Sequence, residues 1–287
     1  MKTILIQLDT DPQPSSFDRV VAIDASVDEL FCYGSVSPES VEPLVHGAMF
    51  TRGPADLKHT AIFIGGSDVA SGERLLARVR KTFFGPIRVS VMMDSNGSNT
   101  TAAAAVLSAK RQFGSFAGVE ALVLAGTGPV GQRAAQLLAA EGASVRVASR
   151  TRDRATKTCD AIASQVPGGK LSPWSTASDS ELRSACEGVQ LVIAAGAAGI
   201  TLLPADVRRS IGSLKVAIDL NAVPPLGIAG VEVMDKAVDR EGVICYGAIG
   251  VGGLKMKIHK AALRRLFESN DQVLDTAAIY QIGQQLS

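Results

Sequence analysis

The sequence is poor in the residues that mark several classes of protein. It has only four cysteines and three histidines in 287 residues, and neither set has the close spacing of a disulfide framework or a metal site. Its 29 basic and 28 acidic residues nearly cancel, which removes the global electrostatic case for binding nucleic acid. We therefore expect no metal and no nucleic-acid partner, and any bound anion must be held locally.

Long hydrophobic runs are scarce as well. The apolar run near the amino terminus is too short, before its first acids, to resemble a secretory signal. The most apolar stretch, residues 189–203, is interrupted by Gln190 and by glycines, and it falls short of the roughly 20 unbroken residues that a membrane helix needs. The sequence therefore predicts a cytoplasmic protein without a membrane partner.

From residue 119 onward, short apolar runs alternate with helix-like stretches, a pattern typical of a parallel sheet with crossover helices. Several runs are apolar on both faces, as expected of strands that helices cover on each side. The fold class is therefore α/β, with a Rossmann-type parallel sheet. The strands are predicted at Ala121–Ala125, Ser144–Ala148, Gln190–Ala195, Val216–Leu220 and Val243–Tyr246.

The residues before this region predict a second, smaller α/β unit. Its strands are expected at Lys2–Leu8, Val20–Ile23, Ala61–Ile64 and Ile87–Met92, and its helices at Gly72–Phe83 and Thr100–Phe113. Helices predicted at Ala261–Glu268 and Asp275–Gln285 follow the last Rossmann strand and can pack back on this unit. We thus predict a smaller domain of residues 1–112 plus about 261–287 and a Rossmann-type domain of residues 113–260.

The motif Gly126-Thr127-Gly128-Pro129-Val130-Gly131 follows a predicted strand and opens a predicted helix, the context in which GxGxxG indicates a dinucleotide site. Gly126 would permit the tight turn, Gly128 would let the backbone approach a pyrophosphate, and Gly131 would let helix and strand pack closely. The helix start would supply N–H donors and partial positive charge. A glycine turn without a ligand is the alternative.

The end of the second Rossmann strand distinguishes NAD from NADP, since an acid there binds the ribose 2′-hydroxyl and repels a 2′-phosphate. The chain has Ser149-Arg150-Thr151-Arg152 and no acid, which favours NADP over NAD. The alternative is a solvated basic turn. Further cofactor-binding candidates follow later strands: Gly196, Ala197, Asn221, Pro224 and Gly247. For Pro224-Pro225 the alternative is a rigid turn, of the kind that a cis bond forms.

The segment Asp94–Thr101 is a polar cluster between a predicted strand and a predicted helix. Ligands of open α/β sheets bind beyond strand carboxyl ends, so this segment is the first candidate for the substrate pocket. Its alternative is an elaborate helix cap, because Ser98 and Asn99 are good N-cap residues. The substrate-binding candidates are Asp18, Arg52, Asp94, Ser95, Asn96, Gly97, Asn99, Thr100, Thr101 and Lys255.

Several peptides go beyond a generic Rossmann pattern. They are Asp9-Thr-Asp11, Thr51-Arg-Gly53, Phe83-Phe-Gly-Pro86, Asp94–Thr101, Pro224-Pro-Leu-Gly227 and Gly247–Lys255. Together with the glycine motif they resemble the bacterial NADP-dependent methylene-tetrahydromethanopterin dehydrogenases of methylotrophs, some of which also accept methylene-tetrahydrofolate. The likeness covers nearly the whole chain.

The resemblance implies a reversible hydride transfer from methylene-tetrahydromethanopterin to NADP⁺ in the oxidation of formaldehyde-level carbon, by a homo-oligomer. It also implies that the first domain binds the pterin substrate, that the second binds NADP, and that a cleft lies between them. A carbon between two nitrogens loses hydride readily, so we expect positioning of the substrates and no catalytic base. No counterpart of the Tyr-xxx-Lys pair of related folate dehydrogenase/cyclohydrolases is found. The alternatives are an NADP-dependent methylene-tetrahydrofolate dehydrogenase and a non-catalytic NADP-binding redox sensor, which would not need Asp94–Thr101.

Overall fold

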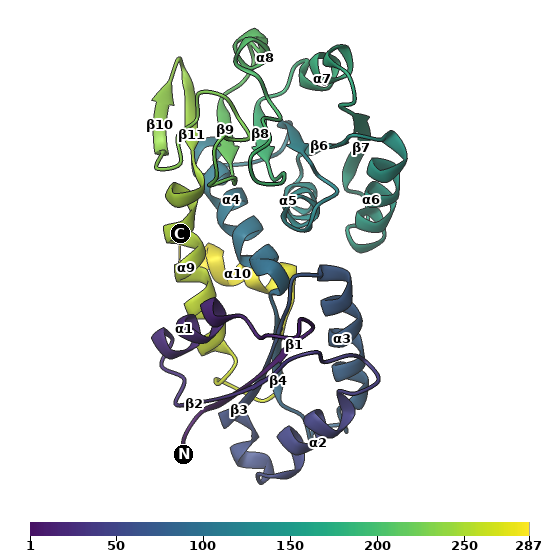
Figure 1. Cartoon of the computed structure of the whole chain (residues 1–287), viewed down its shortest axis with the longest axis vertical. Helices are drawn as coiled ribbons and strands as arrows, with labels where there is room; N and C mark the ends of the chain where they lie inside the picture. Colours follow the sequence, from purple (N-terminus) through teal and green to yellow (C-terminus); the bar gives the residue numbers. More distant parts are fainter. Residues whose placement is uncertain (287) are drawn as a thin grey trace. The chain divides into compact units, whose positions relative to one another are not determined.

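The computed structural model describes residues 1–286, which form two compact units (Figure 1). The first unit comprises Met1–Thr100 and the chain from Met256 onward, and the second comprises Thr101–Lys255. Both points of division fall inside long helices, α4 (Ser98–Phe113) and α9 (Ala248–Arg265). The division expected at residues 112 and 261 lies farther along both helices, because residue spacing does not reveal which turns of a continuous helix belong to which unit.

The first unit contains a five-stranded parallel sheet in the order β12-β4-β3-β1-β2. Its main core lies where β1 and β3 pack against α2 and α3. The strands are β1 (Ile4–Asp9), β2 (Glu29–Tyr33), β3 (Thr60–Gly65), β4 (Ser90–Met93) and β12 (Val273–Leu274). The helices are α1 (Ser16–Asp24), α2 (Glu42–Phe50), α3 (Val69–Thr82) and α10 (Thr276–Gln285), with short 3₁₀ turns η1 (Pro54–His59) and η2 (Ser95–Gly97).

The strand predicted at Val20–Ile23 is wrong, because these residues lie in α1. Ser15 caps this helix by accepting a hydrogen bond from the Asp18 N–H at 3.3 Å. Val21 and its neighbour Ala22 are buried, whereas Val20 and Ile23 are more than half exposed. A run rich in β-branched residues is therefore helical here, with Val21 and Ala22 on the buried side, since capping and burial outweigh a weak local propensity.

The second unit contains a seven-stranded sheet in the order β10-β11-β9-β8-β5-β6-β7, in which only β10 is antiparallel to its neighbour. The five predicted strands are confirmed with small shifts at their ends. The strands are β5 (Glu120–Leu124), β6 (Ser144–Ser149), β7 (Lys170–Ser175), β8 (Leu191–Ala194), β9 (Val216–Asp219), β10 (Lys236–Arg240) and β11 (Val243–Tyr246). The helices are α5 (Pro129–Ala140), α6 (Arg152–Gln165), α7 (Asp179–Cys186) and α8 (Ala205–Ser210).

The order of the strands creates a topological switch point between β5 and β8. From β5 the chain continues through β6 and β7 on one side, whereas from β8 it continues through β9 and β11 on the other. Connections that leave adjacent strands in opposite directions open a crevice at the carboxyl ends, which is where open α/β sheets bind their ligands. The α/β, Rossmann-type fold class is confirmed. Among residues 1–286, no helix combines the length and apolar character of a membrane span.

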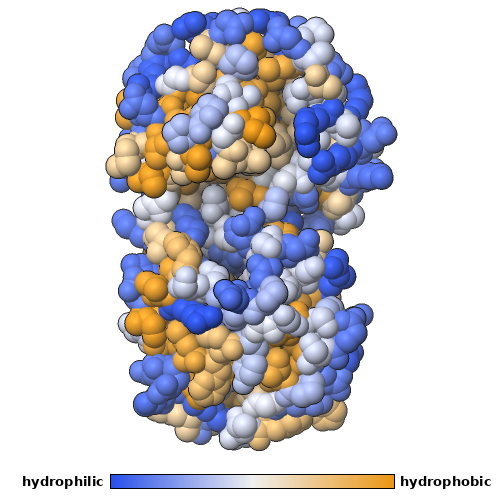
Figure 2. All heavy atoms as spheres, in the orientation of Figure 1, coloured by the Kyte–Doolittle hydropathy of each residue, from blue (hydrophilic) through white to orange (hydrophobic). Residues whose placement is uncertain are grey.

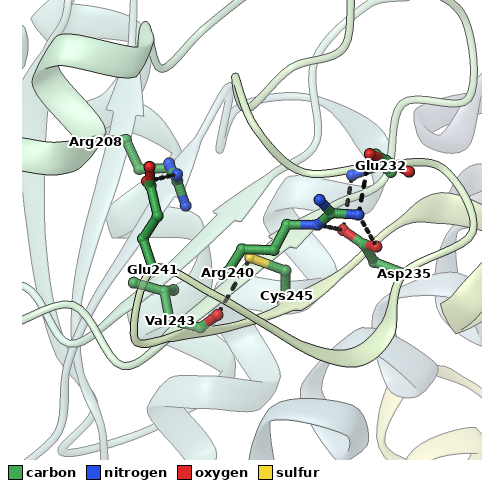
Figure 3. A network of polar contacts seen from close by, with 7 residues as sticks. All are labelled: Arg208, Glu232, Asp235, Arg240, Glu241, Val243 and Cys245. Carbon is green, nitrogen blue, oxygen red and sulfur yellow. Dashed lines mark hydrogen bonds and ion pairs between the residues drawn. The ribbon is translucent and has the colours of Figure 1, made fainter.

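Helix α9 starts thirteen residues before the helix predicted at Ala261, at a place that its glycines make possible. A Cβ on Gly247 would lie 1.9 Å from the Glu232 carbonyl oxygen, and one on Gly250 would lie 1.7 Å from that of Asp235. The helix start therefore lies directly against the backbone of this segment. Arg240 fixes the segment with two hydrogen bonds to the Asp235 carboxylate, at 2.6 and 2.7 Å (Figure 3).

We predict that Gly250→Ala destabilises the protein by about 2 kcal/mol or more, because the added methyl group would overlap a backbone carbonyl that cannot move aside. The matched control is Gly252→Ala on the same helix, where a Cβ meets nothing within 4 Å. That change should be neutral or slightly stabilising, since alanine favours a helix over glycine by roughly 0.5–1 kcal/mol. Denaturant unfolding measures both, and equal stabilities would contradict the packing.

Candidate functional site

The turn between β5 and α5 holds its backbone in unusually close contact. Its left-handed residue is Ala125, with φ of 53°, rather than a glycine. A Cβ on Gly126 would lie 2.9 Å from both the Val123 carbonyl oxygen and Val147 Cγ1, and one on Gly131 would lie 2.7 Å from the Ala125 carbonyl oxygen. Gly131 therefore lets the start of α5 pack closely on the turn that follows β5, and Gly126 is required by close approach and not by a positive φ.

The start of α5 has the character of an anion-binding site. At Gly128 a Cβ would find its nearest neighbour at 3.4 Å, an ordinary contact, so the protein itself does not fill the space over this residue. Pro129 occupies the first helical position, and no side chain caps the helix. The N–H groups of Val130 and Gly131 and the positive end of the helix dipole therefore suit a diphosphate group.

The end of β6 lies beside this turn. The hydroxyl oxygens of Thr127 and Ser149 are 3.5 Å apart, and Ser149 is buried. Arg150 and Arg152 are exposed, and neither forms a salt bridge within residues 1–286. Arg152 also lines a cavity of about 250 Å³ next to Trp174. The structure thus brings the diphosphate turn, a hydroxyl and two uncompensated guanidinium groups together, which fits a nucleotide with a 2′-phosphate.

The other cofactor candidates follow strands β8, β9 and β11 at the same edge of the sheet. Gly196 and Ala197 come after β8, and Gly247 comes after β11. Asn221, which follows β9, is buried, and its side chain forms hydrogen bonds within the local turn. Its Nδ2 donates to the Pro225 carbonyl at 3.2 Å, and its Oδ1 accepts from the Val223 N–H at 3.0 Å. The Pro224–Pro225 peptide bond is cis, which confirms the rigid turn.

Asp219, the last residue of β9, is a residue that the sequence reasoning missed. Its carboxylate is 1% exposed and accepts hydrogen bonds from the Asn221 N–H at 3.0 Å and the Ile228 N–H at 2.8 Å. Burial raises the pKa of this carboxyl group above its ordinary value, against the backbone donors that lower it. The signal in the sequence was an acid within the apolar run Val216–Leu220. Asp219 holds the loop that carries Asn221 in place through these hydrogen bonds.

The buried cysteines of the second unit are poor candidates for chemistry. Burial raises the pKa of the Cys159, Cys186 and Cys245 thiols to about 11, so the thiolate form is scarce at neutral pH.

In the first unit, Asp94 organises the polar segment that follows β4. It is 1% exposed, and its carboxylate accepts the Asn99 N–H at 2.8 Å, the Thr100 N–H at 3.1 Å and the Thr100 hydroxyl at 2.6 Å. Asn99 donates to the Met93 carbonyl at 2.6 Å and accepts from the Thr276 hydroxyl at 2.7 Å. Asp94 therefore caps α4; the alternative of a helix cap is right, but Ser98 and Asn99 are the first residues of the helix and not its capping residues.

The cap leaves a small part of the segment for a ligand. Ser95, like Ser98, is fully buried, and its hydroxyl donates to the Gly65 carbonyl at 3.1 Å. Asn96 is exposed and left-handed, with φ of 55°, and Gly97 beside it is half-buried. Thr101 on α4 is half-buried. The groups that protrude are thus Asn96 and Gly97, held in place by the buried residues around them.

The remaining substrate candidates are dispersed. Arg52 donates to the carbonyls of His59 at 2.7 Å and Lys2 at 3.1 Å, which precede β3 and β1. Because all the strands of this sheet are parallel, Arg52 lies at the amino edge, opposite Asp94, and the structure does not bring it to this segment. Asp18 is half-buried in the first turn of α1, and Lys255 is half-buried within α9 rather than at a helix start.

Two acids after β1 shape the carboxyl edge instead, and sequence reasoning did not assign them a role. Asp9 is 1% exposed and accepts hydrogen bonds from the Asp11 N–H at 2.9 Å and the Ser15 N–H at 3.2 Å. Asp11 accepts from the N–H and the hydroxyl of Ser67, at 3.0 and 2.9 Å. These bonds tie the loop after β1 to the loop after β3. The signal in the sequence was the pair of acids, Asp9 and Asp11, at the end of the first strand.

A glycine turn at the switch point, an uncapped helix start and a basic segment after β6 define a Rossmann-type nucleotide-binding oxidoreductase. The fold agrees with that of quinate dehydrogenase from Corynebacterium glutamicum in complex with NAD, with a TM-score of 0.54, 12% identity and coverage of 99% of both chains. At that identity the likeness shows the fold alone.

Sequence comparison supplies the particular family. Residues 16–96 match the family described as methylene-tetrahydromethanopterin dehydrogenase, N-terminal. The chain is 45% identical, over 287 residues, to the bifunctional protein MdtA of Methylorubrum extorquens, covering 100% of this chain and 99% of that protein. It is 30% identical, over 295 residues, to the NAD(P)-dependent methylenetetrahydromethanopterin dehydrogenase of the same organism, with coverage of 100% and 99%.

The chain therefore belongs to the methylene-tetrahydromethanopterin dehydrogenase family, as the resemblance implied. It is an enzyme of this family that uses a nicotinamide cofactor.

We predict that alanine substitutions at two glycines of the turn have different effects, one on stability and the other on NADP binding. Gly131→Ala should destabilise the protein by about 1–3 kcal/mol, because its methyl group would overlap the Ala125 carbonyl. Gly128→Ala should leave the melting temperature nearly unchanged, because a Cβ fits there, yet weaken NADP binding by narrowing the space above the turn. Thermal unfolding and fluorescence titration with NADPH separate the effects. Unchanged NADPH affinity in Gly128→Ala would refute a nucleotide at this turn.

Proposed function

We propose that this protein catalyses the reversible transfer of a hydride from methylene-tetrahydromethanopterin to NADP⁺, giving methenyl-tetrahydromethanopterin. The observation that carries the proposal is its 30% identity, along its whole length, to an NAD(P)-dependent methylenetetrahydromethanopterin dehydrogenase. The same proposal includes a cytoplasmic location, since NADP is an intracellular cofactor. It also includes a substrate-binding role for the exposed tip of the segment after β4.

The proposed chemistry asks the protein for positioning rather than proton transfer. Loss of hydride from a carbon between two nitrogens leaves a delocalised cation, so no proton has to leave that carbon. Bound NADP⁺ supplies the hydride acceptor, a nicotinamide ring. The acids at the strand ends agree with a role in positioning, because the carboxylates of Asp9, Asp94 and Asp219 accept hydrogen bonds from backbone N–H groups and hold the loops that follow. Their contribution is to fix the loops in geometries that align two substrates.

The preference for NADP rests on the residues after β6. Ser149 ends the strand where an NAD-specific protein carries an acid, and no carboxylate pairs with Arg150 or Arg152 within the described chain. An arginine binds a phosphate through two parallel hydrogen bonds, whereas a ribose hydroxyl gains little from it. We infer that these two guanidinium groups hold the 2′-phosphate.

We predict that the double change Arg150→Ala/Arg152→Ala raises the KM for NADP⁺ by roughly 10- to 100-fold, the effect of losing hydrogen bonds to a charged group. The KM for NAD⁺ should change little, because NAD⁺ has no 2′-phosphate. Arg154→Ala is the matched control, an exposed arginine two residues farther along α6. Steady-state kinetics with both cofactors decides the matter. An equal rise in both KM values would place the arginines elsewhere on the nucleotide.

The activity itself is tested by following NADP⁺ reduction at 340 nm with methylene-tetrahydromethanopterin and methylene-tetrahydrofolate in parallel, with NAD⁺ as the control acceptor. Rapid turnover of the methanopterin form with NADP⁺ is the expected result. Turnover confined to the folate form would replace the substrate with methylene-tetrahydrofolate, and turnover of neither pterin would overturn the proposal.

We also propose that the protein is a homo-oligomer that buries apolar residues of the first unit. Figure 2 shows hydrophobic atoms gathered over α1 and β2. The exposed side chains there are Phe17, Val20 and Ile23 on α1, and Phe31 and Tyr33 on the edge strand β2, each at least 41% exposed. Apolar side chains gathered in this way favour burial against another chain.

We predict that Val20→Asp, whose side chain is 61% exposed, shifts the protein toward the monomer in light scattering without lowering the helix content. Val238→Asp on β10 of the second unit, 38% exposed, is the control and should leave the molar mass unchanged. A monomeric wild-type protein would refute the oligomer.

A further inference from the structure

The first unit contains a cavity of about 740 Å³ that the proposed function does not use. It lies between α3 and the segments that follow β1 and β2, and all of its lining residues belong to this unit. Three cationic side chains of α3, Arg74, Arg78 and Lys81, line one side. Hydroxyl groups of serine and threonine contribute much of the rest, including Thr10 and Ser71.

The spacing of the three cations explains why they share the cavity. Residues 74, 78 and 81 recur at four and three positions along α3, so they lie on one face of the helix. Leu75 and Val79 on the other side of the helix are fully buried in the core. Arg80, which is also exposed, does not line the cavity. Three cationic side chains of α3 therefore face the same cavity.

Nearby carboxylates neutralise only part of this charge. Arg78 forms an ion pair with Glu42, and Arg74 donates to the Ser71 hydroxyl at 2.8 Å. Glu39 lines the cavity, and the Ser37 hydroxyl with the nearby arginines holds the pKa of its carboxyl below the usual range, so it is ionised at neutral pH. Lys81 forms no salt bridge within residues 1–286. Asp68, which caps the start of α3, also attracts Arg74, so Lys81 is the lining cation that no carboxylate pairs with in the described chain.

The cavity adjoins the segment that we propose to hold the pterin ring. Gly72, in the first turn of α3, packs so closely on that segment that a Cβ would lie 2.2 Å from Ser95 Oγ. Its neighbour Ser71 lines the cavity, as does Thr10, which directly follows β1. The Thr10 hydroxyl is buried and has no hydrogen-bond partner in the described chain. The cavity thus begins at Thr10 and Ser71, one residue from the contact between Gly72 and Ser95, and continues along the cationic face of α3.

We propose that this cavity binds the carboxylate-bearing tail of a reduced pterin substrate whose ring lies against residues 94–97. The inference rests on the proposed function for the identity of the ring. Carboxylates of such a tail match the planar guanidinium of Arg74, and Lys81 adds a second cation for a longer tail. Electrostatic attraction of this kind strengthens binding without altering the hydride-transfer step, so it lowers KM and leaves kcat unchanged.

The test compares two probes, tetrahydropteroate, which has no glutamyl residue, and tetrahydrofolate triglutamate, by calorimetric titration of the full chain in the presence of NADP⁺. We expect the triglutamate to bind about 10-fold more tightly at low salt, and this advantage to shrink as ionic strength rises. Arg74→Ala/Lys81→Ala should abolish the advantage and leave tetrahydropteroate binding unchanged. Arg80→Ala, the control on the same helix, should retain it.

An equal affinity of the wild-type protein for both probes would overturn the inference, as would an advantage that survives in Arg74→Ala/Lys81→Ala. Failure of the proposed function has a different signature. It would show as no NADP⁺ reduction with either methylene pterin, whereas the titration reports the tail contact without requiring turnover.

Discussion

Buried aspartates at the carboxyl edges of the two sheets are the constraint on which the candidate binding segments depend. Asp9, Asp94 and Asp219 each end or directly follow a strand, each is 1% exposed, and each accepts hydrogen bonds from backbone N–H groups of the following loop. A buried carboxylate is costly unless donors surround it, and the N–H groups of a tight turn are costly unless acceptors meet them. The hydrogen bonds of each aspartate satisfy both the buried carboxylate and the N–H groups of the turn, so the loops keep their conformation without a bound ligand.

Rigid loops of this kind suit a reaction that needs alignment more than acid–base groups. The buried aspartates at the strand ends accept hydrogen bonds from backbone donors, and the buried thiols of the second unit are held in the protonated form. Catalytic power in such a site comes from holding two reactants at the right separation. A fold shared with quinate dehydrogenase at 12% identity is compatible with this, since a fold supports many chemistries and the loops choose among them.

Anion recognition is handled locally in a chain whose net charge is only +1. The start of α5 offers backbone donors, and Arg150 and Arg152 follow β6 without carboxylate partners within the described chain. In the first unit, Arg74 and Lys81 face a hollow. Each cluster contains few groups. The protein as a whole can therefore stay nearly neutral and still attract anions strongly at the places where a phosphate or a carboxylate is proposed to bind.

The sequence alone determined the Rossmann-type sheet, its nucleotide turn and the absence of an acid after β6. These features depend on local order: apolar runs, a glycine spacing and the residues that follow a strand. Five strands of the second unit were predicted with small shifts at their ends for this reason. The family could also be inferred, because its peptides are spread along nearly the whole chain.

The tertiary structure decided what spacing does not encode. Val20–Ile23 became part of a helix because Ser15 caps it and its buried face packs inward. Arg52 fell at the amino edge of a parallel sheet, away from Asp94, because side-chain position depends on strand direction and sheet order. Asp94 proved to be a helix cap, and the cavity beside α3 arose from segments far apart in the sequence, since burial and hydrogen-bond partners are properties of the packed chain and not of its order.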